Sequence, residues 1–433
     1  MADTSRRTYA LAVLFAINAV NFFDRQILSA LGEPIRREWG LSDGALGALA
    51  TAFTLLYAVA GVPLGRLSDR KPRTRILSAG VFVWSALTGL CGFARGFWEL
   101  FALRLGVGVG EATCAPAATS LIGDLFPAER RGRAMAVFML GLPLGIAASY
   151  AVSSSIAQAW GWRSAFTLAA LPGFACAAAA LLIAEPPRVP ASPPAPGGPA
   201  AASPYGRVLR VPTMAWIILS GALHNFTTYA ISSFLSPYLM RFHGSSLREA
   251  GFVSMLVYGV GGGIGLLLGG AASDAASRRR PGGRALVAAL AILGAAPLLF
   301  AALRRAPGDK VGFALMAGVA VVLLYVYYPA VYSAIQDVVE PGLRGTAMAL
   351  YLMVLYVLGA SLGPIGTGLL SDRFTARAAR AAGVSAHTAE ALEPFRAAGL
   401  QSALEILPLF LVALTLVLFA AARTTARDRD RVE

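Results

Sequence analysis

The chain has 433 residues, of which 57% are hydrophobic and only 14% are charged, and its mean hydropathy is positive. A water-soluble protein cannot bury so much apolar surface, so the composition excludes a soluble globular protein and indicates that a lipid bilayer is the solvent. The formal net charge of +14 is concentrated in connecting segments, which is typical of cytoplasmic loops and gives no reason to expect a nucleic-acid partner.

Apolar runs long enough to cross a bilayer as helices recur along the whole chain. They predict an all-α membrane protein with twelve transmembrane helices. The first run follows Arg6 and Arg7, but it contains Asp24 and lacks a small-residue cleavage site, so we expect a retained helix and not a secretion signal. The predicted spans are 9–31, 45–65, 75–94, 98–122, 132–158, 164–183, 212–240, 249–272, 284–303, 310–337, 343–370 and 401–422.

The connections between the spans predict the orientation. Five basic residues lie in 66–75 and four in 278–284, and both segments fall on the same side as the N-terminus. Because basic residues accumulate on the cytoplasmic side, we predict that both termini are cytoplasmic. We expect a monomeric, multi-pass protein of a bacterial inner membrane, whose longest outer connection, 371–401, contains a short surface helix.

A proline-rich stretch separates the sixth span from the seventh. Eight prolines fall between Pro186 and Pro204, a composition that cannot form a packed core and favours an extended tether. We therefore predict an N-terminal six-helix bundle, a cytoplasmic linker and a C-terminal six-helix bundle, in residues 1–183, 184–210 and 211–433.

Two short patterns occur in both halves at corresponding connections. The pattern Arg-Gly-x-Ala-Met-Ala begins at Arg131 and again at Arg344. The pattern Gly-x-x-x-Asp begins at Gly65 and again at Gly270. Because both patterns recur in the same order, we infer a parallel duplication that gives two pseudo-symmetric bundles with a site between them.

The loop after the second span resembles the signature loop of the major facilitator superfamily. It reads Gly-Arg-Leu-Ser-Asp-Arg-Lys-Pro-Arg, with Pro72 where that pattern usually has glycine. The resemblance implies the major facilitator fold and alternating access. Asp69 can accept hydrogen bonds from the N-terminus of a neighbouring helix and so latch the halves in one state. Alternatively, the loop is only a topogenic basic segment. The predicted latch residues are Gly65, Asp69, Arg70, Arg73 and Asp274.

Within this superfamily, the first half resembles the spinster family of sphingolipid and lysophospholipid transporters. The resemblance rests on Asn21-Phe-Phe-Asp24-Arg25 in the first span and on Arg104-Leu-Gly-Val-Gly-Val-Gly-Glu111-Ala in the fourth. Organic-anion/proton symporters share the first element and also place arginine and glutamate in span four. The resemblance therefore implies a transporter and leaves a lipid-like substrate and an organic anion as alternatives.

Four charged residues lie within long apolar segments, namely Asp24, Arg25, Arg104 and Glu111. Each costs roughly 2.5–3.5 kcal/mol near the membrane centre when it is unpaired. An arginine keeps its proton, whereas a buried carboxylate can gain one. We therefore predict that Asp24 and Glu111 couple protons and that Arg104 and Arg25 bind an anionic group. A purely structural salt-bridge network is the alternative.

The spacing of these charges suggests how they meet. Arg104 and Glu111 are two helical turns apart and share a face, with Gly108 between them expected to leave room for a substrate or for movement of the arginine. One arrangement pairs Asp24 and Arg25 each with the opposite charge on the fourth span.

Polar and aromatic side chains mark the second half. Such groups suit an acyl chain or ring with a few hydrogen bonds, although ordinary aromatic packing is the alternative. Besides the two arginines, the predicted substrate contacts are Asn21 in the first span, His224, Asn225 and Thr228 in the seventh, and Tyr328 and Tyr332 in the tenth.

The leading interpretation is a proton-coupled secondary transporter that moves an amphipathic lipid-like substrate, such as a lysophospholipid or sphingoid phosphate, by alternating access. The alternative cargo is a sugar acid or carboxylate, but the predicted spans of the second half carry lysine or arginine only at their ends and offer none inside the membrane to hold one. The sequence has no His-Glu-x-x-His, no Gly-x-Ser-x-Gly and no metal-binding cluster, so neither an enzyme nor a metal or other cofactor is predicted. The expected partners are the substrate, protons and membrane lipids.

Overall fold

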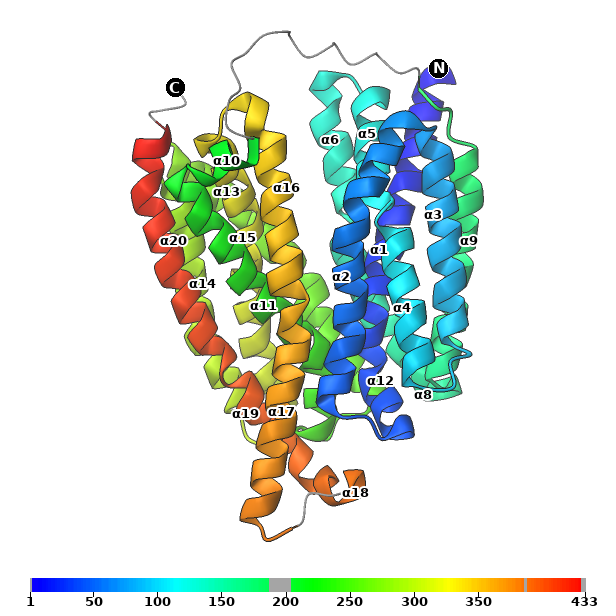
Figure 1. The fold of residues 1–433 in the computed structure, drawn as a ribbon, viewed down its shortest axis with the longest axis vertical. Coiled ribbons are helices and arrows are strands. Elements are labelled where there is room, and N and C mark those ends of the chain that lie inside the picture. The colour runs from blue at the N-terminus through cyan, green and yellow to red at the C-terminus, as the bar shows by residue number, and fades with distance from the viewer. Residues whose placement is uncertain (1, 187–203, 385–387, 430–433) are drawn as a thin grey trace.

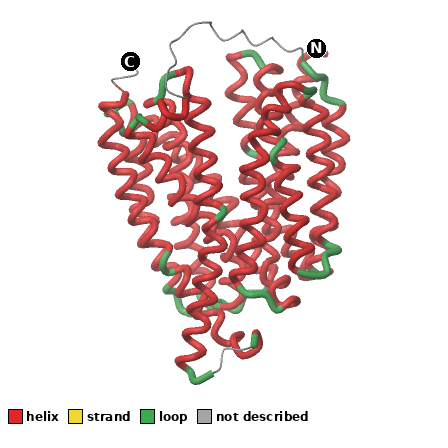
Figure 2. The backbone as a smooth tube through the Cα atoms, viewed as in Figure 1, coloured by secondary structure: helices red, strands yellow, loops and turns green. Residues whose placement is uncertain are grey.

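The computed structural model describes residues 2–186, 204–384 and 388–429, and every regular element within these ranges is a helix (Figure 2). The helices form two groups that stand side by side (Figure 1). α1 (Ala2–Trp39) begins and α20 (Leu407–Arg429) ends at the same end of the molecule. We call this the terminal end and the opposite one the distal end.

Single helices form most crossings of the first bundle. They are α1, α2 (Asp43–Arg70), α3 (Arg73–Cys91) and α9 (Trp162–Leu181). The fifth crossing consists of α6 (Ala128–Met139), α7 (Gly141–Ala148), a π-helical segment η1 (Ser149–Ser153) and α8 (Ser154–Trp160).

The fourth crossing is interrupted at its charged residue. α4 (Phe97–Glu111) ends at Glu111, and α5 (Cys114–Leu125) resumes three residues later. Near the break, Thr113 Oγ1 donates a 2.8 Å hydrogen bond to the carbonyl oxygen of Gly110. Such a bond competes with the hydrogen bonds of a continuous helix. Glu111 therefore lies at a helix end inside the bundle.

The second bundle has the same number of crossings. They are formed by α11 (Pro212–Arg241); by α12 (Leu247–Ser254), η2 (Met255–Val260) and α13 (Gly261–Ser277); by α14 (Gly283–Leu303); by α15 (Lys310–Val338); by η3 (Pro341–Leu343), α16 (Arg344–Val354), η4 (Leu355–Ala360) and α17 (Leu362–Ala381); and by α20. Before α20, the predicted outer connection folds into α18 (Ala389–Leu392), η5 (Glu393–Phe395) and α19 (Arg396–Leu404).

Eleven described helical segments are long and apolar enough to cross a membrane, and α11 is not one of them. It is nevertheless 30 residues long, and its polar residues, including His224, Asn225 and Thr228, are buried. It packs between α1 of the first bundle and α17 and α20 of the second. α11 is therefore the twelfth crossing, in which neighbouring helices replace lipid and permit polar side chains.

The predicted linker, 184–210, lies mostly outside the described residues, since 187–203 are not described. Its last part forms the short helix α10 (Pro204–Leu209), so the prediction of an extended tether is wrong for that part. A single proline at the first position of a helix does not interrupt it.

The two bundles meet mainly toward the distal end. α2 packs against α17, α1 against α11, and α8 against α12, whereas the bundles diverge toward the terminal end (Figures 1 and 2). Glycines permit the closest approach: a methyl group on Gly47 would overlap the backbone of Pro364, and one on Gly368 would overlap the backbone of Asp43. Close backbone packing of this kind holds membrane helices together without a hydrophobic driving force.

Candidate functional site

Two of the four predicted charges form a buried ion pair between α1 and α4. Arg25 Nε donates a 2.9 Å hydrogen bond to Glu111 Oε2, and Asn21 Nδ2 donates another of 2.9 Å to the same oxygen. The Glu111 side chain is fully buried and that of Arg25 is 9% exposed. The predicted pairing of these two charges is confirmed.

The second predicted ion pair is not formed between side chains. Arg104 Nη1 donates a 3.3 Å hydrogen bond to the main-chain oxygen of Asp24, and the carboxylate instead accepts one of 3.3 Å from Thr88 on α3. Successive side chains on a helix point about 100° apart. Asp24 therefore faces α3 while Arg25 faces α4, and the predicted Asp24–Arg104 pair is wrong.

This cluster is incompletely satisfied. Among the described residues, no group hydrogen-bonds to Asp24 Oδ1, Arg104 Nε or Glu111 Oε1, although all three atoms are buried. Leaving such an atom without a partner costs about 1–3 kcal/mol, and more when the group is charged. Buried polar atoms kept at that cost are candidates for binding a proton or a ligand.

The two arginines occupy different surroundings. The Arg25 guanidinium lies 4.1 Å from the ring centre of Tyr57, which contacts Tyr356 of the second bundle at a ring separation of 5.3 Å. Arg104 is 1% exposed and lies 5.0 Å from the ring of Phe53, inside the first bundle. Of the two predicted substrate-binding arginines, Arg25 is therefore the one that lies at the boundary between the bundles.

Gly108 does not leave room for substrate. A methyl group at this position would overlap the backbone oxygen of Phe53 on α2. The prediction is wrong because the missing side chain is used for close packing of α4 against α2.

The predicted contacts of the second bundle gather between α11 and α15. The ring of His224 stacks on that of Tyr327 with ring centres 3.9 Å apart, and His224 Nε2 donates a 2.9 Å hydrogen bond to the carbonyl oxygen of Leu324. The Tyr328 hydroxyl donates a 3.2 Å hydrogen bond to Asn225 Oδ1. These groups form a neutral, aromatic wall. Two further predicted residues adjoin them: the ring of Tyr332 lies 6.0 Å from that of Tyr328, and the main-chain oxygen of Thr228 accepts from Tyr258.

A second buried charge cluster, at the distal end, was not predicted. Arg241 on α11 donates through Nε to Glu33 Oε2 at 2.7 Å, and through both terminal nitrogens to Asp43 at 2.8 and 2.9 Å. Glu33 and Asp43 are fully buried, and the Arg241 side chain is 4% exposed. Because α11 belongs to the second bundle while α1 and α2 belong to the first, these bonds join the bundles. We call Glu33, Asp43, Arg241 and Asp372 the distal lock.

Asp372 completes the distal lock from α17. Its two carboxylate oxygens accept hydrogen bonds of 2.9 and 2.8 Å from the backbone N–H groups of Asp43 and Gly44, at the start of α2. Anionic groups are stabilised at helix N-termini. The sequence carried a signal for this contact, because Gly-x-Leu-Ser-Asp-Arg at 368–373 repeats the pattern at 65–70.

The predicted latch residues make no contact between the bundles within the described part of the chain. A side chain at Gly65 would meet nothing within 4 Å, and the side chains of Asp69 and Arg70 lie outside the described residues. Arg73 pairs with carboxylates of its own bundle, and Asp274 pairs with Arg284 at 3.5 Å. The latch at this end stays a prediction.

The sequence matches the family model of the Major Facilitator Superfamily over residues 14–384. The chain belongs to the Major Facilitator Superfamily. It is 31% identical over 376 residues to an MFS-type efflux pump of Mycolicibacterium smegmatis, covering 86% of each chain. It is 29% identical over 400 residues to protein spinster homolog 1 of Mus musculus, covering 84% of this chain and 73% of the relative.

Solved structures also show a similarity to spinster proteins. The chain is similar, with a TM-score of 0.86 and 28% identity over 98% of both chains, to a bacterial homolog of the human lysosomal transporter Spinster, described as inward-facing and unoccupied. The occupied form gives a TM-score of 0.84. The resemblance to the spinster family is thereby confirmed, and so is the major facilitator fold with two six-helix bundles. The chain is an integral membrane transporter and not an enzyme.

Proposed function

We propose that this transporter couples proton movement to the transport of an anionic amphiphile through the pair formed by Arg25 and Glu111. The observation that carries the proposal is the position of this buried pair at the boundary of the two bundles. While Glu111 is ionised, it holds the Arg25 guanidinium. Once Glu111 takes up a proton, Arg25 lacks a counter-charge, and a phosphate or carboxylate of the substrate can supply it.

Asp24 is proposed as a second proton site. It lies beside the pair on α1, and its Oδ1 receives no hydrogen bond from the described residues. Arg104 binds the main-chain oxygen of the same residue, so it positions this part of α1 more directly than it could contact a substrate. Proton uptake by Asp24 would remove a buried negative charge next to Arg104 and thereby reduce the cost of moving α1.

The neutral wall of the second bundle supports an amphipathic cargo. His224, Asn225 and Tyr328 supply hydrogen bonds and ring faces but no fixed charge. A single cationic site opposite an aromatic wall fits a molecule with one anionic headgroup and an apolar tail. The similarity to spinster proteins supports a lysophospholipid or sphingoid phosphate. The similarity to an efflux pump supports export of an amphiphile.

The distal lock supports alternating access with the terminal end open. Bonds from Arg241 and Asp372 hold the bundles together at the distal end, and the bundles diverge at the other (Figure 1). The similar structures are described as inward-facing. We therefore infer that the terminal end is cytoplasmic, and that transport requires the distal lock to break while the bundles close at the terminal end.

The test of proton coupling separates exchange from accumulation. In proteoliposomes, we expect Glu111→Gln to retain counterflow of sphingosine phosphate, which needs no net proton movement, and to lose accumulation driven by a pH gradient. Glu99→Gln is the matched control, since Glu99 lies on the same helix but caps its start through the N–H of Arg95. Accumulation by Glu111→Gln at the unmodified rate would contradict the coupling role.

The cargo is tested separately by thermal stabilisation. The purified protein is heated with sphingosine phosphate, a lysophospholipid or gluconate, and a ligand that binds the folded state raises the unfolding midpoint. Stabilisation by gluconate alone would favour the organic-anion alternative and overturn the lipid-like cargo.

A further inference from the structure

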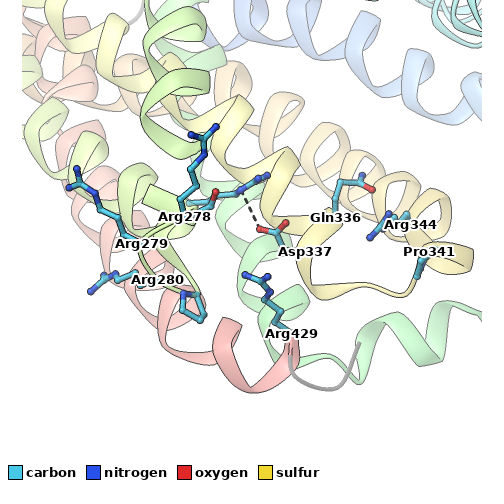
Figure 3. Close-up of a pocket in the computed structure, with 11 residues that line it drawn as sticks. Arg278, Arg279, Arg280, Gln336, Asp337, Pro341, Arg344 and Arg429 are labelled. Carbon is cyan, nitrogen blue, oxygen red and sulfur yellow. Dashed lines mark ion pairs between the residues drawn. The ribbon is translucent and has the colours of Figure 1, made fainter. Parts of the chain in front are cut away.

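A basic pocket lies at the terminal end of the second bundle, and neither Arg25 nor Glu111 lines it. Figure 3 shows the residues that line it. Its volume is about 710 Å³, within the range of small-molecule sites. The ends of α13, α14, α15, α16 and α20 surround it. Six arginines line the pocket: Arg278, Arg279, Arg280, Arg284, Arg344 and Arg429.

The positive charge of the basic pocket exceeds its negative charge. Asp337 is its single carboxylate, and it lies 3.3 Å from Arg284, which also pairs with Asp274 at 3.5 Å. Within the ranges that the structure describes, Arg278, Arg279 and Arg280 form no ion pair. Six arginines around a pocket with one lining carboxylate leave an excess of positive charge, and this arrangement favours an anion.

Close backbone packing fixes the turn that follows Arg278, Arg279 and Arg280. The turn between α13 and α14 requires a glycine at Gly282, whose φ is +76°. A side chain there would also overlap the backbone of Ala422 on α20. Across the pocket, Arg344 Nε donates to the oxygen of Val339 at 3.3 Å, which leaves its two terminal nitrogens for other partners. Figure 3 shows Arg278, Arg344 and Arg429 on separate helix ends around the pocket.

We propose that the basic pocket binds a phosphate-bearing anion, supplied either by a phospholipid headgroup or by a soluble polyphosphate. Guanidinium groups present paired N–H donors that match phosphate oxygens, and such charge-assisted bonds are roughly twice as strong as neutral ones. The pocket is built from the second bundle alone and does not depend on the proposed transport cycle. If the arginines served membrane topology alone, they would need no shared cavity.

The test compares two triple variants of the full-length protein. One carries Arg278→Gln, Arg279→Gln and Arg280→Gln. The control carries Arg130→Gln, Arg131→Gln and Arg133→Gln, which removes the same charge from exposed positions on α6, outside the pocket. Tripolyphosphate is titrated into detergent-purified protein, and phosphatidylglycerol bound to the same protein is counted by native mass spectrometry.

We expect the pocket variant to weaken binding of at least one probe by about tenfold or more, and the control to change it by less than about threefold. Loss for tripolyphosphate identifies a soluble anion, loss for phosphatidylglycerol alone identifies the lipid headgroup, and loss for both supports the shared phosphate chemistry. The proposal is overturned if neither probe binds, or if the two variants lose binding equally. Neither result depends on transport activity.

Discussion

The two buried charge clusters of this transporter are built in opposite ways. In the distal lock, both carboxylate oxygens of Asp43 have partners, and Arg241 uses Nε and both terminal nitrogens. Near the centre of the first bundle, Asp24, Arg104 and Glu111 each keep one buried atom without a hydrogen bond from the described residues. Glu33, Asp43 and Arg241 of the distal lock are as buried as the central charges, so exposure does not explain the contrast.

The difference indicates different roles. A fully bonded cluster stabilises the one arrangement of the bundles that forms it, whereas a partly bonded cluster keeps a capacity to take up a proton or an anion. Changes in the distal lock should therefore alter which end of the transporter opens. A change of Arg25 in the central cluster that keeps its charge should alter binding of the substrate, with little effect on the equilibrium between distally closed and distally open molecules.

The largest effect is expected from Arg241→Gln. Removing one partner of a buried ion pair costs about 3–5 kcal/mol, because Asp43 is then left buried without an ion-pair partner among the described residues, whereas Glu33 keeps Arg36 and Arg37. If the distally closed state loses about 3 kcal/mol of stability relative to the distally open state, the fraction of distally open molecules rises by roughly a hundredfold. The measurement is alkylation of Thr51→Cys by a water-soluble maleimide, since Thr51 bonds to Ser361 between the bundles.

Two features make this measurement specific. The native cysteines, Cys91, Cys114 and Cys176, are first replaced by alanine so that only the new thiol reacts. Arg163→Gln is the control, because Arg163 and Glu38 pair at the distal end with about 41% of each side chain exposed, and such a pair contributes under about 1 kcal/mol. Similar alkylation of the Arg241→Gln and Arg163→Gln variants would show that the buried distal lock does not hold the distal end closed.

Asp372→Asn should have a smaller effect on the same equilibrium. The substitution removes the negative charge and leaves one oxygen for the two N–H groups at the start of α2. The loss of a helix cap costs about 0.5–2 kcal/mol. We expect thiol alkylation at position 51 to rise about threefold to thirtyfold. Unchanged alkylation would show that Arg241 holds the distal end without help from α17.

Arg25→Lys should spare the distal lock and weaken binding. Lysine keeps the charge but lacks the planar pair of donors, so we expect the affinity for sphingosine phosphate to fall roughly tenfold, or about 1.4 kcal/mol. Thiol alkylation should not change. Arg104→Lys is the comparison, because Arg104 lies inside the first bundle, and its effect on affinity should be under about threefold. Equal losses of affinity in the two variants would show that both arginines have the same role in binding.

The sequence predicted the central pair but not the distal lock, and the reason is physical. Arg25 and Glu111 stand out because charge within an apolar run is costly wherever its partner lies. Glu33 and Arg241 fall just beyond the predicted spans 9–31 and 212–240, where they resemble ordinary loop charges. Their bond joins residues 208 positions apart, and α1 continues past Glu33 to Trp39.

The pairing of Asp24 failed for a related reason. Spacing along one helix gives the angle between Asp24 and Arg25, but it does not give the rotation of α1 relative to its neighbours. That rotation depends on close contacts such as those at Gly141 and Gly145, where added side chains would overlap the backbone of α1. Apolar runs in the sequence predicted the crossings, including the more polar α11, whereas the orientation of each charged face was not predictable.

A third charge cluster is paired but partly exposed to water, and it should contribute least to the free energy of unfolding. At the terminal end, Glu185 accepts hydrogen bonds of 2.9 Å from the Thr74 backbone and from Arg73 Nε. Partial burial opposes ionisation, but the bonds from Thr74 and Arg73 hold the pKa of Glu185 below its usual value of 4.5. Because the folded-state pKa is the lower one, this stabilisation is complete above pH 4.5 and is lost as the pH falls through the folded-state value.

Solvent screening limits this contribution to under about 0.5 kcal/mol. Thermal unfolding of detergent-purified protein, followed from neutral pH to about pH 3, should therefore show a small acid-range decrease that Glu185→Gln reduces. Glu340→Gln is the control, since Glu340 pairs with Arg207 at the same end through side chains that are 55% and 43% exposed. If Glu185→Gln destabilised the protein as much as Arg241→Gln does, Glu185 would behave like a residue of the buried clusters. Solvent exposure would then not explain the difference between the three charge clusters.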